Sequence, residues 1–422
     1  NPDVGWQMVI ETNRGCPYSC TFCDWGSLTY SKVLKFNEDR VIAELNWSSN
    51  NKVEYLFIAD ANFGMLYDRD KKFAQHLNQL QVTTGYPVVT IAQWAKNSKA
   101  KTLDIAKIFF NGTNRGFTIS VQSMNDAVLD AIKRQNMDIS ALDSMLKACS
   151  NDGINAYTEL ILGLPYETAE SWKENFGKLL SAGQHNFVDV WFCQLIENSR
   201  LNSHEEIKEH DIKFAEVPKW SYGNPTDEDL DIVEFENVVT STKYMSFDEL
   251  VDSYMFAHVV LTYHYGGWTQ ILSRFLNKYH NLSYLEFYTK LHDHIRDGDG
   301  LLTDQYNNIK NFIIDFMTGN YAPATPAVER LYANINSPDF IFQLSKFSFL
   351  STDIIKNIGS GYLYNQFNVS NTYVNSYSGE FNSTGGFTDI ALNDLKYKEI
   401  SSKLKSLLAY VLQIHDKYAK YI

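Results

Sequence analysis

Three cysteines, Cys16, Cys20 and Cys23, occupy one short loop near the start of the chain. Their C-x3-C-x2-C spacing is too short for a disulfide framework, and their odd number also argues against one. Thiolates are the ligands that soft metal centres such as iron–sulfur clusters prefer. A four-iron cluster held by three thiolates keeps one iron without a protein ligand, where a substrate or cofactor can coordinate. The loop therefore predicts an iron–sulfur site with an open coordination position.

Two other interpretations of the loop are a zinc site and three unrelated buried thiols. Zinc prefers four tetrahedral ligands, and no fourth Cys or His lies within the usual short reach. With aromatic Phe22 just before the last cysteine, the loop resembles the signature of the radical SAM superfamily. That resemblance implies a 4Fe-4S cluster on the three cysteines and S-adenosylmethionine (SAM) on the open iron. It also implies reductive cleavage of SAM to a 5′-deoxyadenosyl radical.

The elements that must position this loop follow an alternating pattern up to about residue 195. The expected strands are 7–12, 54–60, 88–94, 116–122, 155–162 and 187–195, and the expected helices are 37–49, 69–80, 100–110, 126–150 and 168–182. Such alternation predicts right-handed β-α-β units and a parallel sheet. Six units fall short of a closed eight-fold barrel. We therefore expect an α/β fold, a six-stranded parallel partial (β/α)6 barrel, which the family resemblance also implies.

Ligands of parallel β/α folds bind at the carboxyl ends of the strands. The second expected strand ends at Asp60, and Asn62 follows closely. In the radical SAM family, a glycine-rich or acidic tip at this place meets the amino group of SAM. This sequence departs from the common Gly-Gly-Glu version, but Asp60 and Asn62 can both accept from an ammonium group. The alternative is an Asx turn that caps the next helix.

The fourth expected strand alternates polar and apolar residues, so that Thr118, Ser120 and Gln122 share one face by the two-residue period. Three polar groups on one face indicate a wet lumen. The family resemblance implies that Ser120 and Gln122 lie near the ribose and carboxylate of SAM. Lys133 and Arg134 follow this strand, and we expect both to be exposed basic residues without a role.

The fifth expected strand carries Glu159 and leads into Gly-Leu-Pro-Tyr-Glu-Thr, residues 163–168. This tip resembles that of the cobalamin-associated branch of the superfamily. Gly163 would let the backbone approach adenine closely. Glu159 is expected to aim its carboxylate inward, and a buried unpaired carboxylate is costly. Glu159 therefore either binds a cofactor or a cation, or belongs to a structural ion pair.

We expect the barrel to cover residues 1–200, a connecting segment 201–240 and a mostly helical C-terminal domain 241–422. Capping boxes beginning at Ser246 and Ser283 predict helix starts in that domain, and 393–421 is expected to form a last helix. His292 and His294 stand two residues apart, diverge on a helix, and are interpreted as surface residues. Cys149 and Cys193 are interpreted as buried thiols without a metal.

The 422-residue chain is 44% hydrophobic and 21% charged, as in ordinary globular proteins. Fifty acidic and 37 basic residues give a net charge of −13, which offers no basic footprint for nucleic acid or anionic lipid. No apolar stretch approaches the roughly 18 residues that suggest a membrane span. Five cysteines, three of them ligand-like, fit a reducing cytoplasm. We therefore expect a cytoplasmic protein that acts on a small molecule, with no membrane or nucleic-acid partner.

The resemblance implies hydrogen abstraction from an unreactive C–H bond, often followed by methyl transfer in the cobalamin branch. It also implies an electron donor such as flavodoxin or ferredoxin. Members of that branch carry a cobalamin domain before the barrel. Because the chain begins at Asn1 and a strand follows almost at once, we expect that domain to be missing from this sequence. The alternatives are a cobalamin-independent radical SAM isomerase or cyclase and a non-catalytic iron–sulfur module.

Overall fold

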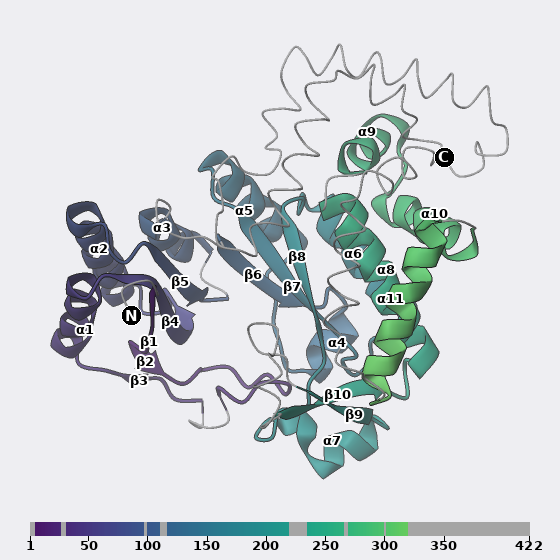
Figure 1. Ribbon diagram of the computed structural model, residues 1–422, viewed down its shortest axis with the longest axis horizontal. Helices are drawn as coiled ribbons and strands as arrows, with labels where there is room; N and C mark the ends of the chain where they lie inside the picture. Colours follow the sequence, from purple (N-terminus) through teal and green to yellow (C-terminus); the bar gives the residue numbers. More distant parts are fainter. Residues whose placement is uncertain are drawn as a thin grey trace. The chain divides into compact units, whose positions relative to one another are not determined.

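The computed structural model describes residues 5–26, 31–96, 99–109, 116–218, 234–265, 269–298 and 301–319. The chain divides into two compact units, which Figure 1 shows in ribbon form. The first unit comprises Asn1–Glu167 and Ala182–Ile212, and the second comprises Thr168–Ser181 and Lys213–Ile422. The candidate cofactor-binding residues all belong to the first unit.

The first unit contains two parallel sheets of three strands each. One sheet has the order β1 (Trp6–Ile10), β4 (Val53–Phe63), β5 (Val89–Trp94), and the other has the order β6 (Phe117–Gln122), β7 (Ala156–Leu162), β8 (Phe187–Phe192). All neighbouring strands in both sheets run parallel. The parallel α/β organisation is therefore confirmed, and each of the six expected strands forms. In the described residues no ladder joins β5 to β6, so a continuous six-stranded sheet stays a prediction.

The helices between these strands are α1 (Glu38–Asn50), α2 (Tyr67–Thr84), α3 (Lys99–Phe109), α4 (Asp126–Ala131), α5 (Ile139–Asn151) and α6 (Ala169–Ser181). All but α6 belong to the first unit, and α6 belongs to the second. Helices α1, α2 and α3 lie together beside the first sheet (Figure 1). Asn37 caps α1 by accepting from the backbone N–H of Arg40 at 3.1 Å, as its side-chain chemistry favours.

The single helix expected over 126–150 is wrong, because the chain breaks it into α4 and α5. Asp138 begins α5 by accepting from the backbone N–H of Ala141 at 2.7 Å. In the turn before it, the side-chain amide of Asn136 donates to the carbonyl oxygens of Val121 and Ser123 at 2.9 and 2.8 Å. Apolar periodicity alone could not show that this turn binds the end of β6.

Apolar side chains of β4, α1 and α2 fill the core of the first unit, and Leu56, Ile58 and Phe73 are fully buried there. Cys149 and Cys193 are buried as well, which confirms their interpretation as core thiols. Desolvation raises the pKa of both thiols to about 12. Both therefore remain protonated at neutral pH and are poor metal ligands.

Two short strand pairs complete the described sheets. Strand β2 (Asn13–Arg14) pairs with β3 (Leu34–Lys35), and β9 (Lys213–Pro218) pairs with β10 (Phe235–Ser241), both antiparallel. The first unit also contains the short 3₁₀ helix η2 (Arg200–Asn202) and helix α7 (His204–Glu209). The segment 201–240, expected only to connect two domains, therefore contains regular structure of its own.

The described part of the second unit beyond β10, up to residue 319, is mainly helical. Its helices are α8 (Phe247–Val260), α9 (Gln270–His280), α10 (Tyr284–Asp297) and α11 (Leu301–Met317), and the π-helical turn Leu261–Tyr265 follows α8. Ser246 forms the predicted capping box with Glu249, and Ser283 accepts from the backbone N–H of Glu286 at 3.1 Å. The helix expected over 393–421 lies outside the described residues.

The interpretation of His292 as a surface residue is wrong. Its side chain is fully buried on α10, and its Nε2 lies 2.9 Å from the hydroxyl of Tyr306 on α11. Burial lowers the pKa of His292 to about 4. His264, in the π-helical turn, is also fully buried and hydrogen-bonds the hydroxyl of Tyr288 at 2.6 Å. Both histidines are therefore neutral side chains in the core of the second unit, which we call the helical unit after its described helices.

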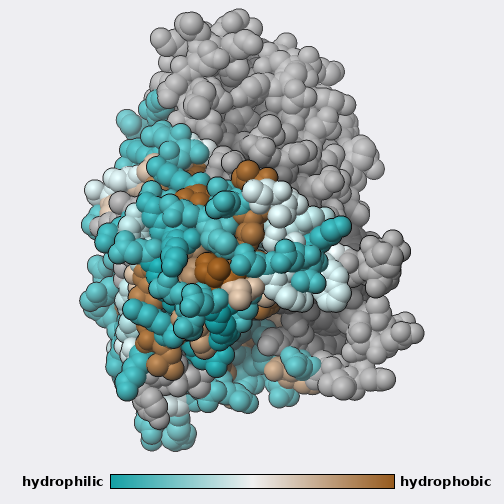
Figure 2. Space-filling model, turned by 90° about the vertical axis from the view of Figure 1, so that its left-hand side faces the viewer, coloured by the Kyte–Doolittle hydropathy of each residue, from teal (hydrophilic) through white to brown (hydrophobic). Residues whose placement is uncertain are grey.

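The coloured part of the face in Figure 2 is mainly hydrophilic, with hydrophobic residues interspersed among polar ones. This fits a chain in which charged residues make up 21% of the sequence. Among the described helices, none combines the length and the apolar character that crossing a membrane requires.

Candidate metal centre

The cysteine loop is held in place from both sides by its backbone. The N–H of Thr21 donates to the carbonyl oxygen of Ile132 at 3.0 Å, and its own carbonyl accepts from the N–H of Leu201 at 2.7 Å. Within the loop, the N–H of Cys23 donates to the carbonyl oxygen of Cys20 at 3.2 Å. The loop is therefore clamped between the turn after α4 and the short helix η2, although these segments are far apart in sequence.

Gly26 closes the loop where no side chain fits. A Cβ atom at this position would lie 2.0 Å from the carbonyl oxygen of Tyr18, a backbone atom that cannot move aside. The loop that carries the three cysteines therefore depends on a glycine just after the last of them.

The three thiols form no disulfide, and Cys16 is buried whereas Cys20 and Cys23 are partly exposed. In the ranges that the structure describes, no three His, Cys, Asp or Glu side chains adopt an arrangement that could hold a metal ion.

Two cationic side chains stand beside the three thiols. Burial lowers the pKa of Lys96, just after β5, whereas the neighbouring Cys16, Cys20 and Cys23 favour its charged form. Cys20 and Cys23 likewise favour the charged form of Arg134, in the turn after α4. Desolvation raises the pKa of the Cys23 thiol, and Lys96 acts against that rise. Positive charge favours the thiolate that metal binding requires. The surroundings of the loop therefore suit an anionic cluster held by three thiolates.

Asn62 connects the end of β4 to the first of the cysteines. Its side chain is only 1% exposed, and its Nδ2 donates to the Sγ atom of Cys16 at 3.1 Å. The other end of the amide, Oδ1, is buried without a hydrogen-bond partner. A buried unpaired acceptor is costly. This atom is therefore available to a ligand with N–H groups, which supports the prediction for Asn62.

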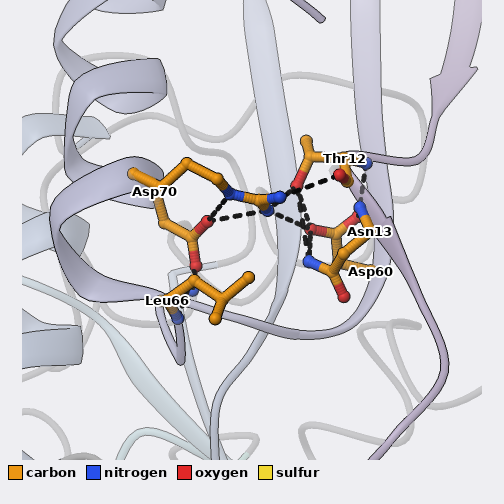
Figure 3. A network of polar contacts seen from close by, with 7 residues as sticks. Thr12, Asn13, Asp60, Leu66 and Asp70 are labelled. Atoms are coloured by element: carbon orange, nitrogen blue, oxygen red, sulfur yellow. Dashed lines mark hydrogen bonds and ion pairs between the residues drawn. The ribbon is translucent and has the colours of Figure 1, made fainter. Parts of the chain in front are cut away.

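Asp60 does not match either role predicted from the sequence. Its fully buried carboxylate accepts from the backbone N–H groups of Thr12 and Asn13 at 2.7 and 3.2 Å. It also accepts from the Thr12 hydroxyl and from the Asn13 amide, the latter at 2.6 Å. Figure 3 shows these contacts converging on the two residues that precede the cysteine loop. Because internal donors occupy this carboxylate, Asp60 positions the loop and is not placed to meet an ammonium group.

The same network continues into α2 through two residues that sequence reasoning missed. The guanidinium of Arg69 donates to the carbonyl oxygen of Thr12 at 3.0 Å and pairs with Asp70 at 3.0 Å. Asp70 in turn accepts from the backbone N–H groups of Gly64 and Leu66 at 2.8 and 3.0 Å (Figure 3). Desolvation raises the pKa of Asp70 to about 6, and Arg69 opposes that rise. The signal in the sequence that could have found them is the adjacent Arg69 and Asp70, a few residues after the end of β4.

The prediction that Ser120 and Gln122 share a face is wrong. Ser120 pairs with Glu159 across β6 and β7, but Gln122 pairs with Leu160, the very next residue of β7. This bulge adds one residue to β6, and one added residue reverses the alternation of side chains. Gln122 is buried with a φ of 65°. It therefore does not continue the polar row begun by Ser120.

Arg134 is buried, so its interpretation as an exposed residue is wrong, whereas Lys133 is exposed. The Arg134 guanidinium donates to the carbonyl oxygen of Ser120 and, at 3.1 Å, to the side-chain oxygen of Asn136. Burial lowers the pKa of Arg134, but Cys20 and Glu159 favour its charged form. A positive charge therefore lies between the cysteine loop and the polar end of β6.

Glu159 is partly buried and accepts a hydrogen bond from the Ser120 hydroxyl. It therefore has partners in the protein, Ser120 by hydrogen bond and Arg134 by charge. Gly163 follows β7 with a φ of 95°, a conformation that glycine favours. Glu167, which was not singled out, is fully buried and accepts from the Ser123 hydroxyl at 2.8 Å. It links the tip of β7 to the end of β6.

Comparison with known proteins gives this arrangement a context. Residues 10–179 match the radical SAM superfamily. The chain is 37% identical over 322 residues to the cobalamin-dependent radical SAM methyltransferase TokK of Streptomyces tokunonensis. It is 36% identical over 321 residues to the 2-(S-pantetheinyl)-carbapenam-3-carboxylate methyltransferase of Streptantibioticus cattleyicolor. Each alignment covers 75% of this chain and 46% of the relative, so the chain spans about half the length of these relatives.

Among solved structures, the chain resembles the radical SAM methyltransferase TsrM of Kitasatospora setae, determined with cobalamin and a 4Fe-4S cluster bound. The TM-score is 0.40 at 15% sequence identity, and the match covers 48% of this chain and 36% of that one. A likeness this loose gives no residue-by-residue correspondence.

Proposed function

Residues 10–179 are a radical SAM domain, and from this premise we propose that the protein is a cobalamin-dependent radical SAM methyltransferase acting on a small molecule. The observation that carries the proposal is the surroundings of Cys16, Cys20 and Cys23. These thiols face two cations and one amide donor, and the two curated relatives are named as methyltransferases. When bound, the cluster and SAM supply the 5′-deoxyadenosyl radical, and cobalamin supplies the methyl group.

In this proposal the chain's own residues divide the binding of the cofactors. Cys16, Cys20 and Cys23 hold the cluster. The unpartnered Oδ1 of Asn62 accepts from the ammonium of SAM, because it is the buried acceptor beside Cys16. The Arg134 guanidinium donates to the carbonyl oxygen of Ser120 and interacts by charge with Cys20 and Cys23. We therefore propose that it binds the carboxylate of SAM.

The tip of β7 completes the proposed nucleotide site. The Ser120 hydroxyl and the Glu159 carboxylate are hydrogen-bonded to each other on paired strands, and both are partly exposed. We propose that this hydroxyl and this carboxylate bind the ribose of SAM. The positive φ of Gly163 keeps the backbone free of a side chain, as close approach of adenine requires. Gln122 is left out, because the bulge takes it off this face.

The partial barrel is proposed to be a continuous six-stranded wall, with the helical unit following it. Reduction of the cluster requires an electron donor, for which flavodoxin or ferredoxin is suited. All five cysteines are free, as expected in a reducing compartment such as the cytoplasm. The expected domain limits, 1–200, 201–240 and 241–422, also remain proposals. Cobalamin is proposed to bind through sequence that precedes this chain in the whole protein.

The test is reconstitution of the chain with iron and sulfide in the absence of oxygen. We expect a brown protein that releases 5′-deoxyadenosine from SAM when dithionite is added. A Cys16→Ala, Cys20→Ala, Cys23→Ala variant is the control and should do neither. Bound zinc, or a wild-type protein that stays colourless, would contradict the proposal. Methylation by the whole protein should depend on added methylcobalamin, and full activity without cobalamin would leave a radical SAM enzyme of another type.

A further inference from the structure

We propose that Asn62 is a redox-tuning residue, whose side-chain N–H group bonds the sulfur of Cys16 and raises the reduction potential of the cluster. The inference rests on the proposed function, because it requires a cluster on the three cysteines. It concerns a different end of the Asn62 side chain from the one proposed to meet SAM.

The geometry places the donor on the sulfur with little freedom. The Nδ2 atom of Asn62 lies 3.1 Å from Sγ of Cys16, and both side chains are buried. The backbone carbonyl of Asn62 accepts from the N–H of Met65 at 3.2 Å, which fixes the turn after β4. The contact is therefore built into the fold and does not depend on a mobile surface side chain.

Asp60, on the same strand as Asn62, holds the chain segment that leads to Cys16. Asp60 precedes Asn62 by two residues in β4, and it binds the backbone N–H groups of Thr12 and Asn13. Cys16 follows Asn13 by only three residues. The end of β4 therefore both fixes the start of the cysteine loop and donates to its first sulfur.

The orientation of the amide follows from its partner. A thiolate that binds iron has no proton to donate, so only the N–H end of Asn62 can bond it. That orientation leaves Oδ1 pointing away from Cys16 and without a partner in the protein. One side chain is thus in contact with a cluster ligand and has a free acceptor for the cofactor that occupies the open iron.

The effect on the cluster has a defined sign. Reduction adds one electron from an external donor, and the cluster and its thiolates become more negative. A hydrogen bond to sulfur stabilises the more negative state, and such bonds are among the factors that set cluster potentials. Removing the donor should therefore make the cluster harder to reduce.

The experiment is a dithionite titration of the reconstituted 4Fe-4S protein without SAM, followed by electron paramagnetic resonance. In Asn62→Leu we expect the ratio of reduced to oxidised cluster at a fixed potential to fall about tenfold, which is about 59 mV for a one-electron couple. Asn62→Asp keeps the shape and replaces the donor by a negative charge, so its potential should fall further. Thr102→Val is the matched control, because it removes a buried, unpartnered hydroxyl close to Gly64, just after β4, and removes no donor to a cysteine sulfur.

Each outcome decides a different point. A wild-type protein that assembles no cluster refutes the proposed function itself. A wild-type cluster whose potential is the same in both Asn62 variants overturns the tuning role, and so does an equal shift in Thr102→Val. If both Asn62 variants fold but hold no cluster, Asn62 is required for assembly and the tuning role is also wrong.

Discussion

Replacing Arg69 by Met should destabilise the first unit by removing the cation that two buried carboxylates share. Arg69 pairs with Asp70 at 3.0 Å and lies 3.9 Å from Asp60, and both carboxylates are fully buried. Removing one partner of a buried ion pair costs about 3–5 kcal/mol. The variant can avoid an unpaired buried charge by protonating one of the two carboxylates. Protonating a carboxylate of ordinary pKa, near 3.8, costs about 4 kcal/mol at pH 7, and this sets an upper limit on the loss. We therefore expect a loss of about 3–4 kcal/mol.

The same reasoning predicts how this loss depends on pH. Without Arg69, the folded-state pKa of both carboxylates rises further above the unfolded value, so the folded variant binds protons more readily than the unfolded chain. Its stability deficit should therefore shrink as the pH falls from 8 towards 5. Asp70 already shows the direction, since burial raises its pKa to about 6 even beside Arg69.

The assay is urea denaturation at pH 8 and pH 5.5, combined with hydrogen exchange of the amides of β4 and α2. Arg40→Met is the control, because Arg40 makes an exposed ion pair with Glu44 and should change stability little. Adding Asp70→Asn to Arg69→Met should recover part of the loss. An Arg69→Met protein as stable as the wild type at pH 8, or a deficit that grows as the pH falls, would refute the reasoning.

Three further predictions follow from single contacts. Gly26→Ala should abolish cluster assembly without unfolding the chain, because the added Cβ would lie 2.0 Å from the Tyr18 carbonyl oxygen. Iron content measures cluster assembly and circular dichroism measures folding. A normal iron content would contradict this prediction. Arg134→Leu should weaken SAM binding to the reconstituted protein about 10- to 100-fold, since hydrogen bonds to charged groups are worth about 1.5–3 kcal/mol. Equilibrium dialysis measures this affinity. An unchanged affinity would show that Arg134 does not bind the carboxylate of SAM. The helical unit should lose stability as the pH falls from 6.5 towards 4, because burial lowers the pKa of His292 to about 4 and the unfolded chain takes up the proton first. That loss, about 3 kcal/mol for His292, should be smaller in His292→Gln, and equal pH profiles for the two proteins would count against it.

The sequence by itself determined the chemistry that the protein could perform. Three cysteines on one loop and six alternating strands are local patterns, and the residue period of a strand or helix is visible along the chain. The caps at Ser246 and Ser283 were equally readable, because a cap and its partner lie within one helical turn. These features predicted the parallel α/β fold and the loop on which the radical SAM assignment rests.

Only the tertiary structure decided which polar groups meet. Asn62 and Cys16 are 46 residues apart, and Asp60 and Thr12 are 48 residues apart. The bulge in β6 moved Gln122 off the face of Ser120, and the break between α4 and α5 buried Arg134 beside Cys20. Periodicity reports which face a residue takes relative to its neighbours in the chain. It does not report what that face is packed against, because a distant partner is set by how strands and turns assemble in space.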